Sequence, residues 1–139
     1  AGLDAGYYLY AYPYQRLALK HAIEWAANEH PPVQITAPMC VHSTVMRQEL
    51  KSGTRLVVHL FSDLNTTAHH ALPSDDIPLR EETVPIHNIQ VAWSQKYRLK
   101  RVLQQPEGIE LPVERSDRGA LVIVPRLDIH TLVVAELEP

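Results

Sequence analysis

A change of hydrophobic period at Pro31 and Pro32 constrains this chain more than any other feature. Before these prolines, apolar residues between Leu19 and Ala26 recur at intervals of three and four, the pattern of an amphipathic helix. Adjacent prolines end such a helix because neither carries an amide hydrogen. After them, short runs rich in β-branched residues are separated by turn residues, which is typical of strands. The sequence therefore predicts one helix followed by a β domain.

The strand-like runs are separated by turn signals. These signals are Ser52-Gly53, Glu107-Gly108 and Asp117-Arg118-Gly119, each at the boundary between two runs and at about the spacing found in β-sandwiches. The fold class we predict is mainly β: an antiparallel β-sandwich of seven to eight strands preceded by one amphipathic helix. The predicted strands are 33–37, 41–48, 55–62, 82–92, 96–104, 109–115, 119–125 and 130–137.

Three local features refine the predicted sandwich. Residues 55–62 carry apolar side chains on both faces, which predicts a central strand. A short connection separates 119–125 from 130–137, which predicts a hairpin. Pro85 and Pro112 remove ladder donors, so we expect the runs that contain them to be edge strands or bulges.

The length of the chain bounds its domain organisation. A chain of 139 residues can bury one sizeable core. We therefore expect residues 33–139 to form the C-terminal β-sandwich domain and residues 1–32 to be the terminal helix of a preceding α/β domain. A single amphipathic helix needs a surface for its apolar stripe, and aromatic residues enlarge the area to be covered. We predict an interface made by Tyr7, Tyr8, Tyr10, Tyr12, Tyr14 and Trp25.

Composition excludes several classes of partner. The net charge of −3 and the charged share of 21% give no reason to expect a nucleic-acid surface. No run approaches the roughly 20 apolar residues of a transmembrane helix, and the first residues show no signal-peptide pattern. We therefore expect no membrane association and a cytoplasmic location. Cys40 is the only cysteine, so an intrachain disulfide and a zinc site with paired cysteines are excluded. The sequence holds no glycine-rich phosphate-binding motif, and we predict no cofactor.

Acidic pairs stand at Asp75-Asp76 and Glu81-Glu82. A glycosidase needs two carboxylates that face each other across the sugar, roughly 5 to 9.5 Å apart. Neighbouring residues on a strand point to opposite faces, and a pair in a loop is usually solvated. We therefore interpret both pairs as surface charge and predict no catalytic residue in this chain.

The histidines fall into two groups. His69 and His70 share a long loop with several aspartates, and imidazole and carboxylate groups suit zinc or manganese. Their spacing fixes no coordination geometry, so we predict no metal site. His42, His59 and His87 lie beside or within apolar runs, where we expect each to be retained in the core for one hydrogen bond.

Trp93 and Tyr97 offer an alternative function for the predicted sandwich. Carbohydrate-binding modules use exposed aromatic rings that stack on sugar faces. These two residues flank a three-residue segment that suits a turn or a bulge. Both are candidate sugar contacts, whereas the competing interpretation is packing of two amphipathic aromatic rings at the rim of the domain.

Several segments together resemble one protein family. The chain is similar to the C-terminal region of large bacterial glycoside hydrolases with a β-galactosidase trimerisation domain, which is glutamine-amidotransferase-like. The resemblance covers nearly the whole chain. The segments that carry it are Tyr12-Pro13-Tyr14-Gln15-Arg16, Ala37-Pro38-Met39-Cys40-Val41-His42, Leu56-Val57-Val58-His59-Leu60, Ile77-Pro78-Leu79-Arg80-Glu81-Glu82 and Val124-Pro125-Arg126-Leu127.

The resemblance implies a multidomain parent with a catalytic barrel first, an α/β domain next and a small β domain last. In that arrangement the barrel supplies the catalytic carboxylates, so no catalytic residue carries over to this chain. The expected partners are the preceding domains of the same polypeptide and further copies of it. We therefore predict a non-catalytic accessory domain that stabilises domain or subunit assembly. The alternative is a carbohydrate-binding module that uses Trp93 and Tyr97.

Overall fold

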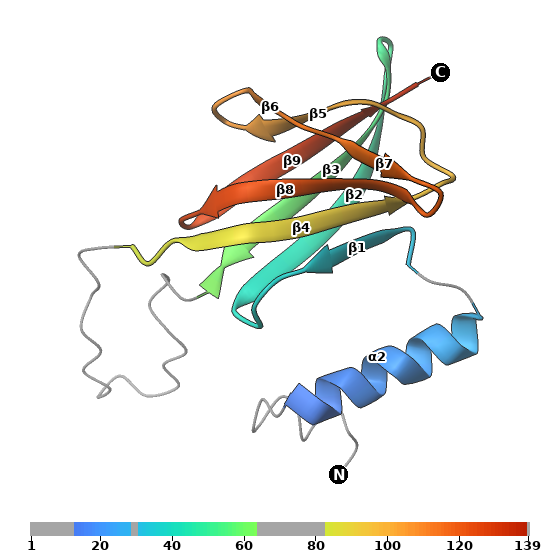
Figure 1. The fold of residues 1–139 in the computed structure, drawn as a ribbon, viewed down its shortest axis with the longest axis vertical. Helices are drawn as coiled ribbons and strands as arrows, with labels where there is room; N and C mark the ends of the chain where they lie inside the picture. Colours follow the sequence, from blue (N-terminus) through green and yellow to red (C-terminus); the bar gives the residue numbers. More distant parts are fainter. Residues whose placement is uncertain (1–12, 29–30, 64–82, 139) are drawn as a thin grey trace. The chain divides into compact units, whose positions relative to one another are not determined.

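A computed structural model describes residues 13–28, 31–63 and 83–138 of the chain (Figure 1). The chain divides into two compact units, residues 1–32 and residues 33–139. That the first unit ends a preceding α/β domain stays a prediction.

The described part of the first unit is the helix α2 (Pro13–Ala27). Proline suits the first position of a helix because the amide hydrogen it lacks would be unpaired there. Asn28 follows the helix in a left-handed conformation, with a φ of 52°, and its amide donates to the carbonyl of Trp25 at 3.3 Å. An asparagine in this conformation is a common helix C-cap. The predicted helix is confirmed.

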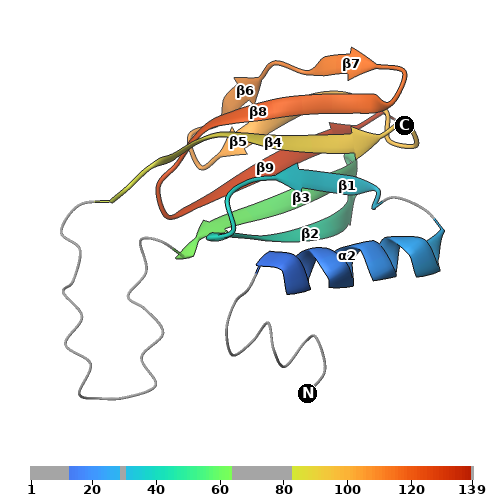
Figure 2. The same cartoon turned by 60° about the horizontal axis from the view of Figure 1, so that its bottom comes forward.

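The second unit is a sandwich of two antiparallel sheets (Figures 1 and 2). The four-stranded sheet has the order β1 (Val33–Thr36), β4 (Ile86–Ser94), β8 (Gly119–Leu127) and β7 (Glu114–Ser116). The five-stranded sheet has the order β2 (Val41–Leu50), β3 (Gly53–Ser62), β9 (His130–Leu137), β5 (Leu99–Gln105) and β6 (Ile109–Leu111). The predicted fold class, a mainly β antiparallel sandwich preceded by one helix, is confirmed.

The core lies between the facing sides of the two sheets. Alternate residues of the strands point inward, as the two-residue period of a strand requires. Val58 and Val133 of the five-stranded sheet and Val91 and Val124 of the four-stranded sheet are completely buried. Because both sheets contribute to one continuous cluster, the sandwich buries its own apolar faces.

The predicted hairpin of 119–125 with 130–137 is wrong. Strand β8 pairs with β4 and β7, whereas β9 pairs with β3 and β5 in the other sheet. Asp128 and Ile129 carry the chain from one sheet to the other, and the Ile129 carbonyl accepts a hydrogen bond from the amide of Ser62 at 2.7 Å. Alternating apolar residues suit a hairpin and a corner between two sheets equally well, so the pattern did not distinguish them.

The proline-containing runs have different outcomes. Strand β4 begins at Ile86, just after Pro85, and lies between β1 and β8, so the expected edge position is wrong there. Pro112 separates β6 from β7, and each of these short strands is the edge of a different sheet. The predicted run 109–115 is therefore two strands, and the described residues hold nine strands instead of seven to eight. Strand β3 is central, as predicted.

Candidate functional site

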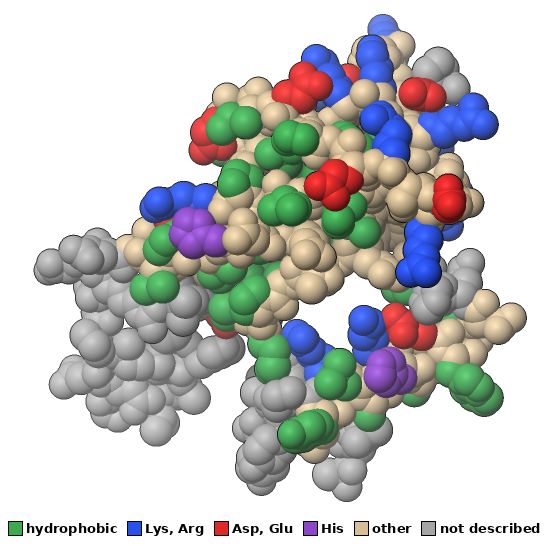
Figure 3. Space-filling model, viewed as in Figure 1, with side chains coloured by type: hydrophobic (Ala, Val, Ile, Leu, Met, Phe, Trp, Pro, Cys, Tyr) green, Lys and Arg blue, Asp and Glu red, His purple; other side chains and the backbone are tan. Residues whose placement is uncertain are grey.

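A cleft of about 970 Å³ opens at the end of the sandwich where the β2–β3 turn, the start of β5 and the end of β9 meet. We call it the cationic cleft, because most of its charged groups are basic. Figure 3 shows Lys and Arg side chains gathered at this end of the second unit. The charged residues that line the cleft are Arg47, Arg55, Lys96, Lys100, Arg101, Glu136 and Glu138.

One row of polar side chains crosses the outer face of the five-stranded sheet into the cleft. The strand register places Gln48, Arg55, Glu136 and Arg101 side by side on four neighbouring strands. The Arg55 Nε donates to Gln48 Oε1 at 2.8 Å, and two guanidinium nitrogens of Arg101 each donate to a carboxylate oxygen of Glu136 at 2.8 Å. Such two-pronged pairing fixes the orientation of a guanidinium group.

A local irregularity of β5 turns two consecutive cations outward. Leu99 and Val102 are buried, while Lys100 and Arg101 between them are both exposed. The register with β9 shifts between Leu99 and Arg101, which is the behaviour of a β-bulge. Without the extra residue, one of the two cations would face the core.

Electrostatics within the cleft favour the ionised form of Glu136. The hydrogen bonds from Arg101 hold the pKa of this carboxyl below its ordinary value, and the charges of Arg101, Lys100 and Arg55 act in the same direction. The same contact raises the pKa of Arg101. Glu136 therefore remains an anion, and hydrogen-bond acceptor, at neutral pH.

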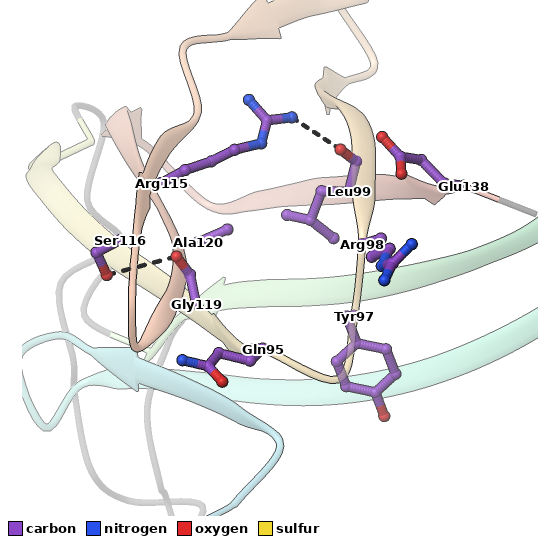
Figure 4. A pocket seen from close by; sticks show the side chains of 9 residues that line it. All are labelled: Gln95, Tyr97, Arg98, Leu99, Arg115, Ser116, Gly119, Ala120 and Glu138. Carbon is purple, nitrogen blue, oxygen red and sulfur yellow. Dashed lines mark hydrogen bonds between the residues drawn. The ribbon is translucent and has the colours of Figure 1, made fainter.

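Tyr97 lies on the wall between the cationic cleft and a smaller pocket of about 220 Å³. In the smaller pocket, Arg115 Nη2 donates to the carbonyl of Leu99 at 2.8 Å, which connects β7 to the start of β5 (Figure 4). The Tyr97 ring is half-buried, and Lys96 Nζ lies 5.7 Å from its centroid. Glu138 lines both cavities as well.

Trp93 occupies the core instead of the surface. Its side chain is 2% exposed and belongs to the hydrophobic cluster between the sheets. A ring that is covered on all sides cannot stack on a sugar. The prediction that Trp93 contacts a sugar is therefore wrong. Only three residues separate Trp93 from Tyr97, yet β4 ends at Ser94 and the chain turns out of the core between them. Tyr97 stays a predicted sugar contact.

The predicted interface residues are described only in part. Tyr14 is 81% exposed and Trp25 is 85% exposed. Tyr7, Tyr8, Tyr10 and Tyr12 lie outside the described residues. An interface on this helix therefore stays a prediction.

The three histidines expected in the core lie on the surface instead. His42 approaches Asp63 with its Nε2 at 3.6 Å, and the His87 ring is 2.9 Å from the carbonyl of Pro125. His59 is half-buried on the outer face of its sheet, where its Nδ1 lies 3.3 Å from Nε2 of His130. The expectation of one hydrogen bond holds for His59 and His87, whereas the contact of His42 is longer than a hydrogen bond. The expected burial is wrong because these positions alternate with the core positions of their strands.

Among residues 13–28, 31–63 and 83–138, no group of three or more His, Cys, Asp or Glu side chains is arranged to hold a metal ion. His69 and His70, the two loop residues considered as metal ligands, lie outside this part of the chain. Both acidic pairs, 75–76 and 81–82, also lie outside it. Within the same described residues, no helix is long and apolar enough to cross a membrane.

Comparison with known proteins identifies a structural neighbour. The chain matches the α-L-fucosidase isoenzyme 2 from Paenibacillus thiaminolyticus over 86% of its own length, with a TM-score of 0.65 and 22% sequence identity. That protein is a bacterial glycoside hydrolase. The chain shares the fold of one part of it. The match covers 17% of the enzyme, so most of that enzyme has no counterpart in this chain. No family model and no curated protein sequence matches the chain.

The sequence did not reveal the cleft residues. Arg55, Lys100 and Glu136 are far apart along the chain and belong to no motif. They meet because β3, β9 and β5 are neighbours in one sheet. The one available signal was the pair Lys100-Arg101, which breaks the alternation of its strand.

Proposed function

We propose that the sandwich is a non-catalytic accessory domain of a multidomain glycoside hydrolase and that it stabilises domain or subunit assembly. The fold likeness to part of an α-L-fucosidase carries this proposal, because it relates most of the chain to a small part of a much larger glycoside hydrolase. The resemblance to enzymes with a β-galactosidase trimerisation domain agrees with the same class of parent. Fold alone does not fix activity, so the substrate of the parent is left open.

The exposed apolar side chains of α2 support an assembly role. Tyr14, Ile23 and Trp25 present large apolar surfaces on one short helix. Helices of this length derive most of their stability from packing against a partner. In this proposal the partner is the preceding domain of the same polypeptide, or another copy of it. Aromatic side chains are enriched at such contacts.

The test compares the longer polypeptide that carries this chain with a version that lacks residues 33–139. We expect the truncated protein to melt at a lower temperature. We also expect it to contain fewer subunits per particle, as light scattering measures. The 139-residue chain alone should release no nitrophenol from aryl fucosides or aryl galactosides. Hydrolysis by the chain alone would refute the accessory role. An unchanged melting temperature together with an unchanged number of subunits after truncation would refute it as well.

The position of Tyr97 favours a second candidate function, carbohydrate binding. The Tyr97 ring lies at the wall of a cleft lined by charged groups, with the amide of Gln95 in the adjoining pocket, and an aromatic ring beside polar groups suits a sugar. Titration of the ¹⁵N-labelled chain with neutral and acidic oligosaccharides, followed by NMR, tests it directly. We expect shifts confined to the neighbours of Tyr97 and abolished by Tyr97→Ala. Absence of saturable shifts with every sugar would reject this function and leave the accessory role standing.

A further inference from the structure

The charge of the cationic cleft is opposite to that of the whole chain. Five basic side chains and two carboxylates line it, an excess of three positive charges. The complete chain carries a net charge of −3. A concave surface of one sign attracts ligands of the other sign and raises their local concentration. The cleft is therefore suited to an anionic ligand.

Part of this positive charge is not neutralised by neighbouring side chains. Arg101 is paired with Glu136 at 2.8 Å, and Arg47 is paired with Glu49 at 3.0 Å. Arg55 donates to the neutral amide of Gln48. Within the part of the chain that the structure describes, Arg55, Lys96 and Lys100 form no ion pair, although they line the same cleft.

The lowered pKa of Glu136 reflects the positive charges around it in the cationic cleft. Arg101, Lys100 and Arg55 all lower the pKa of its carboxyl. One carboxylate thus faces three cations, and it forms its two short hydrogen bonds with Arg101 alone. A second acidic group, brought by a ligand, would find Arg55 and Lys100 available.

The other groups of the cleft distinguish a sugar from a bare phosphate. Glu136 and Glu138 repel any anionic group, but their oxygens accept hydrogen bonds from the several hydroxyl groups that an oligosaccharide supplies and a bare phosphate does not. Tyr97 adds an aromatic ring for a sugar face. A volume of about 970 Å³ is at the upper end of the range for small-molecule sites and accommodates a short oligosaccharide.

We propose that the cationic cleft binds an acidic oligosaccharide, with the carboxylate or sulfate of one sugar residue held by Arg55 and Lys100 and with a sugar ring against Tyr97. This inference rests on the carbohydrate-binding function proposed above and names its ligand class. It is independent of the accessory role in assembly.

The experiment compares two probes with the same sugar rings, in which a charged carboxylate replaces the neutral hydroxymethyl group at C6. Trigalacturonic acid and its neutral counterpart galactotriose are titrated into the 139-residue chain, and calorimetry and NMR record binding. We expect the acidic trisaccharide to bind at least about tenfold more tightly at low salt. Raising the ionic strength to about 0.15 M should reduce that difference, because exposed charges are screened.

Three variants locate the interaction. Lys100→Gln and Arg55→Gln should each weaken binding of the acidic probe several-fold and leave the neutral probe unchanged. Tyr97→Ala should weaken both probes. Lys20→Gln is the matched control, because it removes one exposed cation from α2, where Lys20 lies beside Glu24 at 3.8 Å. Circular dichroism establishes that each variant is folded.

The outcomes distinguish a failure of the acidic ligand class from a failure of the carbohydrate-binding function itself. Equal binding of both trisaccharides, insensitive to Arg55→Gln and Lys100→Gln, keeps the carbohydrate-binding function and overturns the acidic ligand class. No binding of either trisaccharide overturns both. Binding of inorganic phosphate or of single-stranded oligothymidylate as tight as that of trigalacturonic acid, with the same variant dependence, identifies a phosphate-binding surface and also overturns the proposal.

Discussion

The two units of the chain treat their apolar side chains in opposite ways. The sandwich places its largest aromatic residue, Trp93, in the core at 2% exposure. The helix α2 leaves Trp25 at 85% and Ile23 at 67% exposure. Burial of apolar area is the main stabilising term of folding, about 25 cal/mol per Å². The contrast shows that the sandwich has a core of its own, whereas the helix exposes large apolar side chains, as the proposed interface requires.

Removal of the Trp93 side chain is the strongest test of the sandwich's self-sufficiency. Trp93→Ala should lower the free energy of unfolding by about 3–5 kcal/mol, because it leaves a large cavity between the sheets. Urea denaturation followed by circular dichroism measures this loss.

Trp93→Phe is the matched variant for that measurement. It retains an aromatic ring and removes an indole Nε1 that has no hydrogen-bond partner among the described residues. We expect it to cost clearly less than the alanine variant. A loss below about 1 kcal/mol for Trp93→Ala would show that the core is not the main source of stability.

The second prediction concerns the β7–β8 turn, which presses against the end of β4. A Cβ added at Gly119 would collide with the carbonyl oxygen of Trp93, and the φ of 131° is itself unfavourable for other residues. Gly119→Ala should therefore destabilise the sandwich by about 1–3 kcal/mol.

Gly108 provides the control for this clash. It also has a positive φ, of 72°, but a Cβ there meets no atom within 4 Å. Gly108→Ala should cost only the strain of the left-handed conformation, about 1–2 kcal/mol. Chemical denaturation of both variants measures the difference. An equal loss at the two positions would mean that contact with Trp93 contributes nothing.

How much of this fold the sequence could predict depends on the range of the interactions involved. The helix and most strand positions follow from local periodicity, and the turn at Gly53 lies where β2 and β3 form their hairpin. The pairing of β8 with β4 and of β9 with β3 was not predictable, because alternating residues fit either sheet. Trp93 was misjudged for a similar reason: its alternation places it inward only once the sheet is known.

The candidate site was less predictable than the fold. Arg55, Lys100 and Glu136 become neighbours through strand register and a β-bulge, neither of which the sequence specifies locally. Tyr97 was found because aromatic residues near a turn are visible without knowledge of the pairing. Local chemistry is therefore readable from this sequence, whereas a site assembled across a sheet is not.

The third prediction concerns the carboxylate of Glu136 at the charged end of the sandwich. The pKa of Glu136 is lowered in the folded state by Arg101, so this group stabilises the fold above its ordinary pKa of 4.5. That contribution should disappear as the pH falls from about 4.5 through the lower folded-state value.

Denaturation at a series of pH values below neutrality tests this dependence. Glu136→Gln should lose less stability on acidification than the unmodified chain does. Glu114→Gln, which removes a carboxylate that forms no ion pair among the described residues, should follow the unmodified chain. Parallel curves for all three proteins would exclude a stabilising role for the pair of Arg101 with Glu136.

The smallest expected effect on stability lies on the helix, and it completes the contrast between the units. Trp25→Ser should change the free energy of unfolding of the sandwich by less than about 0.5 kcal/mol, because the side chain is 85% exposed. The same substitution should reduce binding of a hydrophobic dye and any self-association seen by light scattering, since Trp25 is the largest apolar group on α2. A large loss of sandwich stability would instead show that Trp25 packs on the second unit, and the helix would then belong to the sandwich and not to a partner.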